Sequence, residues 1–337
     1  MGRVLLHKVD PGAPVKKLVS IVCPMLNEQA NVGYFYTEVS QALAGVADLV
    51  DFEFVFVDDG STDQTLNLLE GLSKDDPRIT IIKLSRNYGF QPAIMTGYAH
   101  CKGDAAIQID SDLEDPPEIM CGFVKQWLEG HKIVYGIREK RQESWLKEQS
   151  RKIFYRFMKK ISDQDLPLDA GDFMLIDRKI IDVLKSYRSS NLYLRGTIYS
   201  MGFSRVGIGF ARNKRKFGTS KFPLVKMISL AWDGIISQSI IPLRLATLVG
   251  FVVILGCLGL SGFYLLEYLF DPTDIPPGWM TLTLITLFCL GMNAMFFGII
   301  GEYIARIYRQ TRNEPVSTVE WVHLSTHHQR APCLTEV

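Results

Sequence analysis

Two aspartates placed two residues apart are the first candidates for chemistry. Asp110 and Asp112 directly follow the apolar run 104–109. In an extended backbone, residues i and i+2 point the same way, so both carboxylates can face one point. Paired carboxylate oxygens suit a hard cation such as Mg²⁺ or Mn²⁺, which also takes water and phosphate oxygens as ligands. Glu114 can add a third oxygen, and a solvated acidic turn is the alternative interpretation.

A second acidic cluster follows the apolar run 52–57. One of Asp58 and Asp59 can accept hydrogen bonds from a nucleotide base or ribose. The other, together with Ser61 and Thr62, can cap the next helix, because such side chains accept from the first free N–H groups. Both interpretations stay open from the sequence.

A third polar cluster follows the apolar run 18–23. Asn27 and Glu28, in PMLNE, leave the same choice between a helix cap and a ligand contact. A cation held by only two or three carboxylates is completed by phosphate oxygens, so the clusters together predict a nucleoside diphosphate as part of the substrate. No GxGxxG segment follows any apolar run, which disfavours a dinucleotide cofactor.

Alternating strands and helices must position these clusters. A mostly parallel sheet covered on both faces is the architecture that such alternation predicts. In such a sheet the carboxyl ends of the strands form the ligand-binding edge, where all three clusters would meet. We expect strands at 18–23, 52–57, 79–84, 104–109 and 132–136, and helices at about 30–44, 62–74, 91–101 and 116–130.

Charge is distributed unevenly along the 337 residues. Residues 1–120 hold 9 Lys and Arg against 18 Asp and Glu, whereas residues 121–337 hold 28 against 18. The acidic part suits a metal, and the basic part suits phosphate or a membrane surface. Six cysteines are scattered without a CxxC pair, which argues against zinc and disulfides and favours a reducing cytosol.

Two uncharged stretches, 245–266 and 279–301, are each long enough to cross a bilayer core of about 30 Å. Buried core helices are the alternative, but such helices rarely stay apolar on every face over this length. The connecting loop 267–278 has no Lys or Arg, while Arg244 precedes the first stretch and three arginines follow the second. The positive-inside rule therefore places both outer flanks in the cytoplasm.

Two basic segments precede these stretches. Residues 138–160 carry 9 Lys and Arg interleaved with apolar residues, and residues 205–226 carry 7 and no acidic residue. A basic amphipathic segment suits the anionic cytoplasmic leaflet. General membrane adhesion explains most of these charges, and the two predicted spans argue against nucleic acid as a partner.

Six motifs together resemble a known family. In chain order they are VSIVCPMLNE, FVFVDDGSTD, LSRNYGFQPAIMTGYAHCKGD, IDSDLEDPPE, DAGDFMLIDRK and RKFGTSK. This order is similar to that of family 2 glycosyltransferases with the GT-A fold. The resemblance covers about residues 18–312 and is greatest to the polyprenyl-phosphate branch, which holds bactoprenol glucosyltransferases and dolichol-phosphate mannose synthases.

The resemblance implies roles for individual residues. Nucleotide-sugar binding falls to Pro24, Asn27, Glu28, Asp58, Asp110 and Arg138. Metal binding falls to Asp110 and Asp112, with Glu114 standing where the family usually has Gln. Binding of the acceptor phosphate falls to Arg215, Lys221 and Arg151. Asp172 matches the aspartate often proposed as catalytic base, and Asp112 shares the catalytic role.

The resemblance also implies a fold and a division of the chain. We expect an α/β GT-A domain in the cytosol with a Rossmann-like, mostly parallel sheet, then amphipathic interfacial helices and two C-terminal transmembrane helices. The predicted parts are an N-terminal extension (1–17), the catalytic domain (18–204), a basic loop with interfacial helices (205–242), the two transmembrane helices (243–312) and a cytoplasmic tail (313–337).

The implied activity is the inverting, metal-dependent transfer of a hexose to polyprenyl (undecaprenyl) phosphate, with UDP-glucose as the expected donor. GDP-mannose or a UDP-modified pentose as donor, and a non-catalytic scaffold that binds a nucleotide sugar, are the alternatives. We expect a multi-pass protein of the inner membrane, a homo-oligomer, with its catalytic domain and both termini in the cytoplasm. A phosphate monoester is largely ionised near neutral pH, so Asp172 is expected to position groups more than to act as a base.

Overall fold

The computed structural model describes most of the chain in five continuous ranges. These are residues 16–138, 170–187, 194–213, 278–311 and 315–324, and scattered positions between 246 and 270 are also described. Several predicted features lie outside the described residues: most of the basic segment 138–160, the motif RKFGTSK and the interfacial stretch 222–241.

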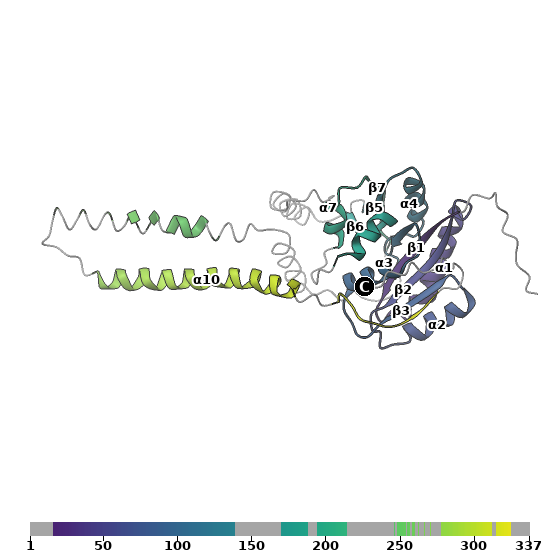
Figure 1. Ribbon diagram of the computed structural model, residues 1–337, viewed down its shortest axis with the longest axis horizontal. Helices are drawn as coiled ribbons and strands as arrows, with labels where there is room; N and C mark the ends of the chain where they lie inside the picture. The colour runs from purple at the N-terminus through teal and green to yellow at the C-terminus, as the bar shows by residue number, and fades with distance from the viewer. Residues whose placement is uncertain are drawn as a thin grey trace, which may run out of the picture.

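An eight-stranded sheet forms the centre of the described structure, in the order β7-β5-β6-β4-β1-β2-β3-β8 (Figure 1). The strands are β1 (Lys17–Met25), β2 (Val50–Asp58), β3 (Ile79–Leu84), β4 (Ala105–Gln108), β5 (Ile133–Arg138), β6 (Ala170–Asp177), β7 (Arg205–Phe210) and β8 (Val319–His323). The five strands predicted from the sequence are confirmed as β1 to β5.

The pairing is parallel across the part of the sheet that carries the acidic clusters. β1 pairs in parallel with both β2 and β4, and β2 pairs in parallel with β3. β6 runs antiparallel between β4 and β5, and β8 runs antiparallel along the outer edge of β3. The sheet is therefore mostly parallel, as expected for an α/β fold of the GT-A kind, with one antiparallel strand inserted and another added.

Helices cover both faces of the sheet. They are α1 (Val32–Leu43), η1 (Ala44–Val46), α2 (Thr65–Asp75), α3 (Phe90–His100), α4 (Ile119–Leu128), α6 (Arg178–Lys185) and α7 (Leu194–Ser200). One core lies under α1, α2 and α4, and the other lies under α3, α6 and α7. Because side chains alternate along a strand, Ile21 and Cys23 enter the first core whereas Val22 enters the second.

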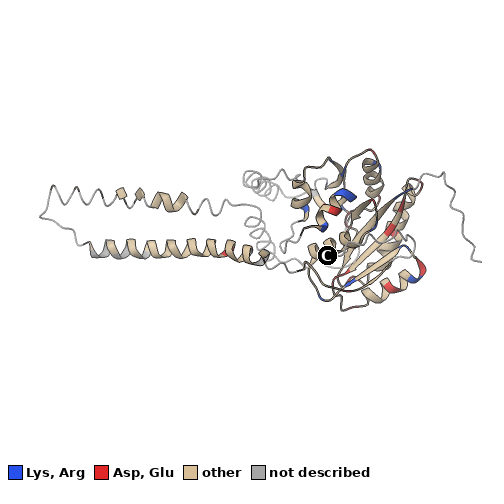
Figure 2. Ribbon diagram, in the orientation of Figure 1, with Lys and Arg blue, Asp and Glu red and all other residues tan. Residues whose placement is uncertain are grey.

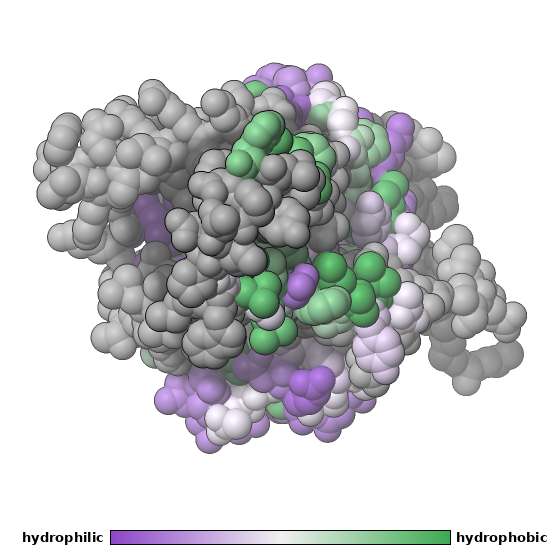
Figure 3. All heavy atoms as spheres, turned by 90° about the vertical axis from the view of Figure 1, so that its left-hand side faces the viewer, coloured by the Kyte–Doolittle hydropathy of each residue, from purple (hydrophilic) through white to green (hydrophobic). Residues whose placement is uncertain are grey.

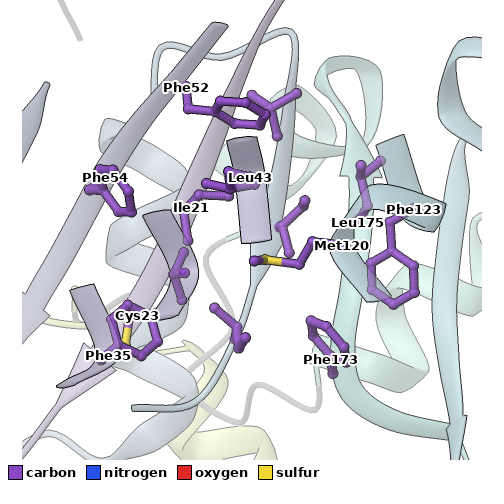
Figure 4. Packing of buried hydrophobic residues seen from close by; sticks show 14 of the residues in the cluster. Ile21, Cys23, Phe35, Leu43, Phe52, Phe54, Met120, Phe123, Phe173 and Leu175 are labelled. Carbon is purple, nitrogen blue, oxygen red and sulfur yellow. The ribbon is translucent and has the colours of Figure 1, made fainter. Parts of the chain in front are cut away.

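The first core is dense in aromatic side chains, as Figure 4 shows. Phe35 of α1 meets the Phe56 ring edge-on at 5.9 Å between centroids, and Phe123 of α4 lies 4.7 Å from the Phe173 ring on β6. Aromatic pairs of this kind stabilise a core beyond their buried area. This packing fixes α4 against β6 and thereby fixes the ends of β4 and β6 that carry the candidate site.

The last described helix, α10 (Trp279–Thr311), extends away from the sheet as Figure 1 shows. It has no charged residue from Trp279 to Gly301, and Figure 2 shows it almost free of charge up to its end near the sheet. Its Phe297 side chain is 73% exposed. Figure 3, viewed from the left-hand side of Figure 1, shows hydrophobic side chains in the middle of the view and hydrophilic ones toward its lower margin.

Among the described residues, α10 is the one helix long and apolar enough to cross a membrane. The first predicted span, 245–266, is described only in part, and its described positions are helical. A Cβ added at Gly250 would lie 3.4 Å from the Phe296 ring, so this part runs beside α10. The expectation of two transmembrane helices is therefore not confirmed by the described residues.

Candidate active site

The turn after β4 holds the paired aspartates in a constrained backbone. The Leu113 N–H donates to the Asp110 carbonyl at 3.3 Å, and the Glu114 N–H donates to Asp112 Oδ1 at 3.1 Å. Leu113 has a φ of 49°, which L residues with side chains seldom adopt. Such strained backbone is characteristic of functional sites, because the surrounding structure must hold it.

The Asp110 carboxyl lies among other carboxylates. Its pKa is raised to about 7, first by burial and then by the charges of Asp112, Asp115 and Asp172, while Arg138 lowers it. A carboxyl with so much negative charge around it is stabilised by a cation. The chemistry of the donor set therefore fits Mg²⁺ or Mn²⁺ at Asp110 and Asp112.

These carboxylates do not form a complete metal site by themselves. Within the described ranges, no three His, Cys, Asp or Glu side chains are arranged to hold a metal ion. Two aspartates with water and diphosphate oxygens match the coordination that Mg²⁺ takes in nucleotide enzymes.

Glu114, predicted as a third metal ligand, has a different partner in the structure. Its carboxylate contacts the Arg212 guanidinium, and its carbonyl accepts from the Asn213 N–H at 2.8 Å. Both contacts tie the metal turn to the residues that follow β7. The carboxylate is therefore used in an ion pair with the chain's own arginine.

Asp115 is a buried acidic residue that the sequence analysis did not single out. It is 3% exposed and accepts from Arg138 Nε at 3.2 Å and from Arg138 Nη2 at 2.9 Å. Arg212 Nε lies 3.5 Å from the same carboxylate. Arg138, predicted to bind the nucleotide sugar, thus makes a two-point contact with Asp115 beside the metal turn. The acidic run DSDLED was the available signal, but nothing in the sequence identified the arginines.

Asp58 has the properties of a ligand contact. It is fully buried, its Oδ1 accepts from the Ser61 N–H at 3.3 Å, and its Oδ2 has no hydrogen-bond partner among the described residues. Burial raises the pKa of this carboxyl. Because buried acceptors are almost always paired in native proteins, this oxygen is available to accept from an ordered water or from a donor group of a ligand.

Asp59 does not cap α2, so the interpretation that it caps the helix after β2 is wrong. Its carboxylate accepts from the Tyr88 N–H at 2.7 Å and from the Gly89 N–H at 2.9 Å. α2 starts only at Thr65, and its N-cap residue makes no side-chain cap. Asp59 therefore joins the end of β2 to the loop after β3, a long-range contact that local sequence cannot reveal.

Asn27 and Glu28 join the end of β1 to the loop after β2. Asn27, with a φ of 55°, accepts from the Thr62 N–H at 2.8 Å and donates its own N–H to Ser61 Oγ at 2.9 Å. The Glu28 N–H donates to Thr65 Oγ1 at 2.8 Å. Neither residue is the N-cap of α1, because that position belongs to Asn31.

The Cys23 thiol shows that the first and third clusters share one edge. Burial raises its pKa, and the charges of Asp110, Glu28 and Asp112 raise it further. Backbone contacts agree with this: the Ile109 N–H donates to the Val22 carbonyl at 3.1 Å, and the Asp59 N–H donates to the Met25 carbonyl at 2.9 Å, so the ends of β4, β1 and β2 lie side by side. Pro24 lies buried inside β1, just past the last β1 residue that pairs with β4, so its missing N–H interrupts no ladder bond there.

Asp172 lies on β6 and is paired with an arginine that the sequence analysis missed. Arg195 Nε, in the first turn of α7, lies 3.1 Å from Asp172 Oδ1. In the antiparallel register of β4 and β6, Gln108 is opposite Met174, so Asp172, two residues earlier on β6, lies near the turn that follows β4. The predicted acceptor-phosphate residues Arg151, Arg215 and Lys221 lie outside the described residues.

Comparison with known proteins identifies the class to which this fold and site belong. The family Glycosyl transferase family 2 matches residues 20–184. An uncharacterized glycosyltransferase of Bacillus subtilis (strain 168), YkcC, is 37% identical over 303 residues, which is 89% of this chain and 93% of that protein. The chain therefore belongs to glycosyltransferase family 2 and is a glycosyltransferase.

Bactoprenol glucosyl transferases are among the relatives. That of Shigella phage SfII is 31% identical over 306 residues, covering 90% of this chain and 98% of the phage protein. Among solved structures, the mannosyltransferase PcManGT from Pyrobaculum calidifontis, in complex with GDP-Man and Mn²⁺, is 16% identical with a TM-score of 0.42. The match covers 86% of this chain and 90% of that chain.

Proposed function

We propose that this protein transfers a hexose, glucose from UDP-glucose, to polyprenyl (undecaprenyl) phosphate at the cytoplasmic face of the inner membrane. The observation that carries the proposal is the group of carboxylates at the turn after β4, where buried Asp115 accepts from Arg138 and the charges of Asp112, Asp115 and Asp172 raise the pKa of Asp110. The names of the bactoprenol relatives support glucose and the lipid acceptor.

The carboxyl edge has two halves, and both are assigned to binding the donor. The donor half lies at the ends of β1 to β3 and includes Asp58, and the metal half lies at the turn after β4 and includes Asp110 and Asp112. Asp58 presents its free, buried oxygen to an N–H or O–H of the nucleoside. Asp110 and Asp112 hold Mg²⁺ or Mn²⁺, which when bound stabilises the negative charge that develops on the departing diphosphate. Arg138 and Arg212, both paired with Asp115, keep the metal turn in place.

The acceptor needs little proton transfer. Its phosphate monoester has a second pKa of about 6, so the attacking oxygen already carries charge near neutral pH. That oxygen attacks C1 of the sugar in line, the bond from C1 to the nucleoside diphosphate breaks, and the configuration at C1 inverts. Asp172, oriented by Arg195, positions the reacting groups, and the basic residues Arg151, Arg215 and Lys221 are proposed to bind the acceptor phosphate.

α10 and the stretch beside it support attachment to a membrane. The 18-residue window Phe288–Ala305 is unburied, and a solvated protein seldom exposes so large an apolar surface. With the positive flanks, this supports two transmembrane helices within 243–312, a multi-pass topology and both termini in the cytoplasm. Assembly as a homo-oligomer stays a prediction.

The test is a transfer assay with purified full-length protein, short polyprenyl phosphate, Mn²⁺ and radiolabelled UDP-glucose, GDP-mannose or a UDP-pentose. We expect label in the organic phase with UDP-glucose, and its loss in Asp110→Asn. Asp75→Asn, an exposed carboxyl at the end of α2, is the matched control and should keep wild-type activity. Label from another donor alone would redirect the proposal, and transfer retained in Asp110→Asn would contradict the metal role of Asp110. Absence of label with every donor would favour the non-catalytic scaffold.

A further inference from the structure

The chain after α10 returns to the catalytic sheet. α10 ends at Thr311, and the described chain resumes at Pro315 and forms β8 from Val319. Four Cα steps of about 3.8 Å limit the distance between Thr311 and Pro315 to about 15 Å. β8 then pairs antiparallel with β3, with Ile82 opposite Val322. The membrane helix is thus linked by a few residues to the strand beside the donor half of the site.

β8 and the residues before it contact the loop after β3. The Ser85 N–H donates to the Thr318 carbonyl at 3.0 Å, and the Ser317 hydroxyl lies 2.5 Å from that of Thr96 on α3. The loop 85–89 supplies the Tyr88 and Gly89 N–H groups that bind Asp59. One side of this loop is therefore fixed by the donor half of the site, and the other side is fixed by the C-terminal segment.

An ion pair joins β8 to a lysine whose charge acts on Asp58. Glu320 Oε2 lies 2.9 Å from Lys83 Nζ. Lys83 is opposite Asp58 in the register of β2 and β3, and its positive charge opposes the effect of burial on the pKa of Asp58. Glu320 on β8 therefore fixes the position of the Lys83 ammonium, and the charge of this ammonium acts on Asp58.

We propose that the segment 315–324 is required for nucleotide binding. In it, Ser317 and Thr318 position the loop 85–89, and Glu320 positions Lys83. This inference rests on the proposed function for the identity of the ligand, a nucleoside diphosphate. The donor site is complete only when the chain that leaves the membrane helix has paired with β3. An unpaired β3 edge would leave its N–H and C=O groups, and the loop that follows, without this support.

Two truncations test the inference in the otherwise full chain. A stop after Glu314 removes the segment, whereas a stop after Leu324 keeps it and removes only residues 325–337. The binding of UDP with Mn²⁺, measured by titration calorimetry, should weaken about tenfold or more after the first stop and stay at the wild-type value after the second. Equal affinities in both truncated proteins would overturn the inference.

Point variants keep the test valid where the shorter protein fails to fold. Glu320→Gln should raise the KM for the donor about threefold while leaving kcat and the KM for polyprenyl phosphate unchanged. His323→Ala, exposed on the same strand, is the matched control and should change neither. A donor KM that is the same in Glu320→Gln as in wild type would count against the role of Glu320.

Exchanging the charges distinguishes an ion pair that only stabilises the pairing of β3 with β8 from one that positions Lys83 at the donor site. Lys83→Glu combined with Glu320→Lys keeps an ion pair between β3 and β8 but places a carboxylate beside Asp58. We expect Glu320→Lys alone to lower the thermal midpoint and the double exchange to restore it to the wild-type value. The affinity of the double variant for UDP should stay about tenfold below that of wild type. Recovery of both would overturn the role of Lys83 at the donor site.

The two proposals fail in different ways. Wild-type protein that transfers no sugar, yet binds UDP in a manner that depends on the segment 315–324, would refute the proposed function and leave this inference standing. Wild-type transfer together with UDP affinity that is independent of the segment would refute this inference alone.

Discussion

The two halves of the carboxyl edge are built differently. At the ends of β1 to β3, carboxylate and amide side chains accept from main-chain N–H groups, as Asp59 does from Tyr88 and Gly89. At the ends of β4 to β6, carboxylates and guanidinium groups gather: Asp115 accepts from Arg138, and the charges of Asp112, Asp115 and Asp172 raise the pKa of Asp110. The first half is held by its own hydrogen bonds, whereas the second carries negative charge that a cation and a diphosphate would compensate.

This difference predicts which substitutions affect chemistry and which affect structure. A change in the metal half should lower the rate of transfer with little change in stability, except where it leaves Asp115 unpaired. A change in the donor half should alter stability and donor affinity together, because the same hydrogen bonds hold the loops and shape the site. The following substitutions test this contrast in order of expected size.

The largest effect is expected for Asp112→Asn. Removing one of two metal carboxylates should lower kcat about a thousandfold, because the charge on the leaving diphosphate is no longer stabilised. The measurement is label transfer at saturating donor and acceptor, with a thermal melt as control. A loss of stability in Asp112→Asn as large as its loss of activity would instead indicate that Asp112 has a structural role, like the residues of the donor half.

The next effect is expected for Arg138→Met. Asp115 is buried and would lose the two-point contact at 2.9 and 3.2 Å, with Arg212 Nε left at 3.5 Å. Leaving a buried charge poorly paired should lower the free energy of unfolding by about 3 kcal/mol. Urea denaturation of detergent-solubilised protein measures it. Arg138→Met combined with Asp115→Leu should recover much of the loss, and a double variant no more stable than the single one would contradict this account.

A backbone contact in the donor half gives the third effect. Gly60 has a φ of 75°, and a Cβ there would lie 2.7 Å from the Arg86 carbonyl carbon. Gly60→Ala should therefore destabilise the protein by about 2 kcal/mol and weaken UDP binding, since it separates the loops after β2 and β3. Gly130→Ala is the control, because its φ of 111° is equally unusual but a Cβ there would meet no atom within 4 Å. Equal losses in both variants would show that the close approach at Gly60 is unimportant.

Glu114→Gln should have the smallest effect. In the structure its carboxylate is paired with Arg212, so we expect the metal to be held mainly by Asp110 and Asp112. We expect the kcat and the activity's dependence on Mn²⁺ concentration to stay within about threefold of wild type. A strong shift in the Mn²⁺ requirement would instead support the original prediction that Glu114 binds the metal.

Local patterns were enough to predict much of the fold. Apolar runs gave β1 to β5, and the polar residues after them marked the edge where the site lies. The antiparallel strand β6 was not predicted, although its AGDFMLID segment was recognised as a motif. Its insertion between β4 and β5 depends on packing such as that of Phe173 against Phe123, which no local pattern encodes.

The site divides in the same way. The acidic pair Asp110 and Asp112 was identified from its residue types and its place after an apolar run. The two residues lie in a turn after β4 and not in the extended strand that the spacing argument assumed. The partners of these residues were not found. Asp115 is joined to Arg138 across 23 positions, and Asp59 is joined to Tyr88 across 29.

The sequence by itself determined the acidic clusters, the positions of the first five strands along the chain and the long apolar stretches, since each depends on residue type and short-range periodicity. Only the tertiary structure decided that Glu114 faces Arg212, that Asp58 keeps a buried free oxygen and that residues 319–323 return to the edge of β3. These features depend on which distant segments the two cores bring together. Such proximity is set by packing over the whole domain, so no local sequence pattern indicates it.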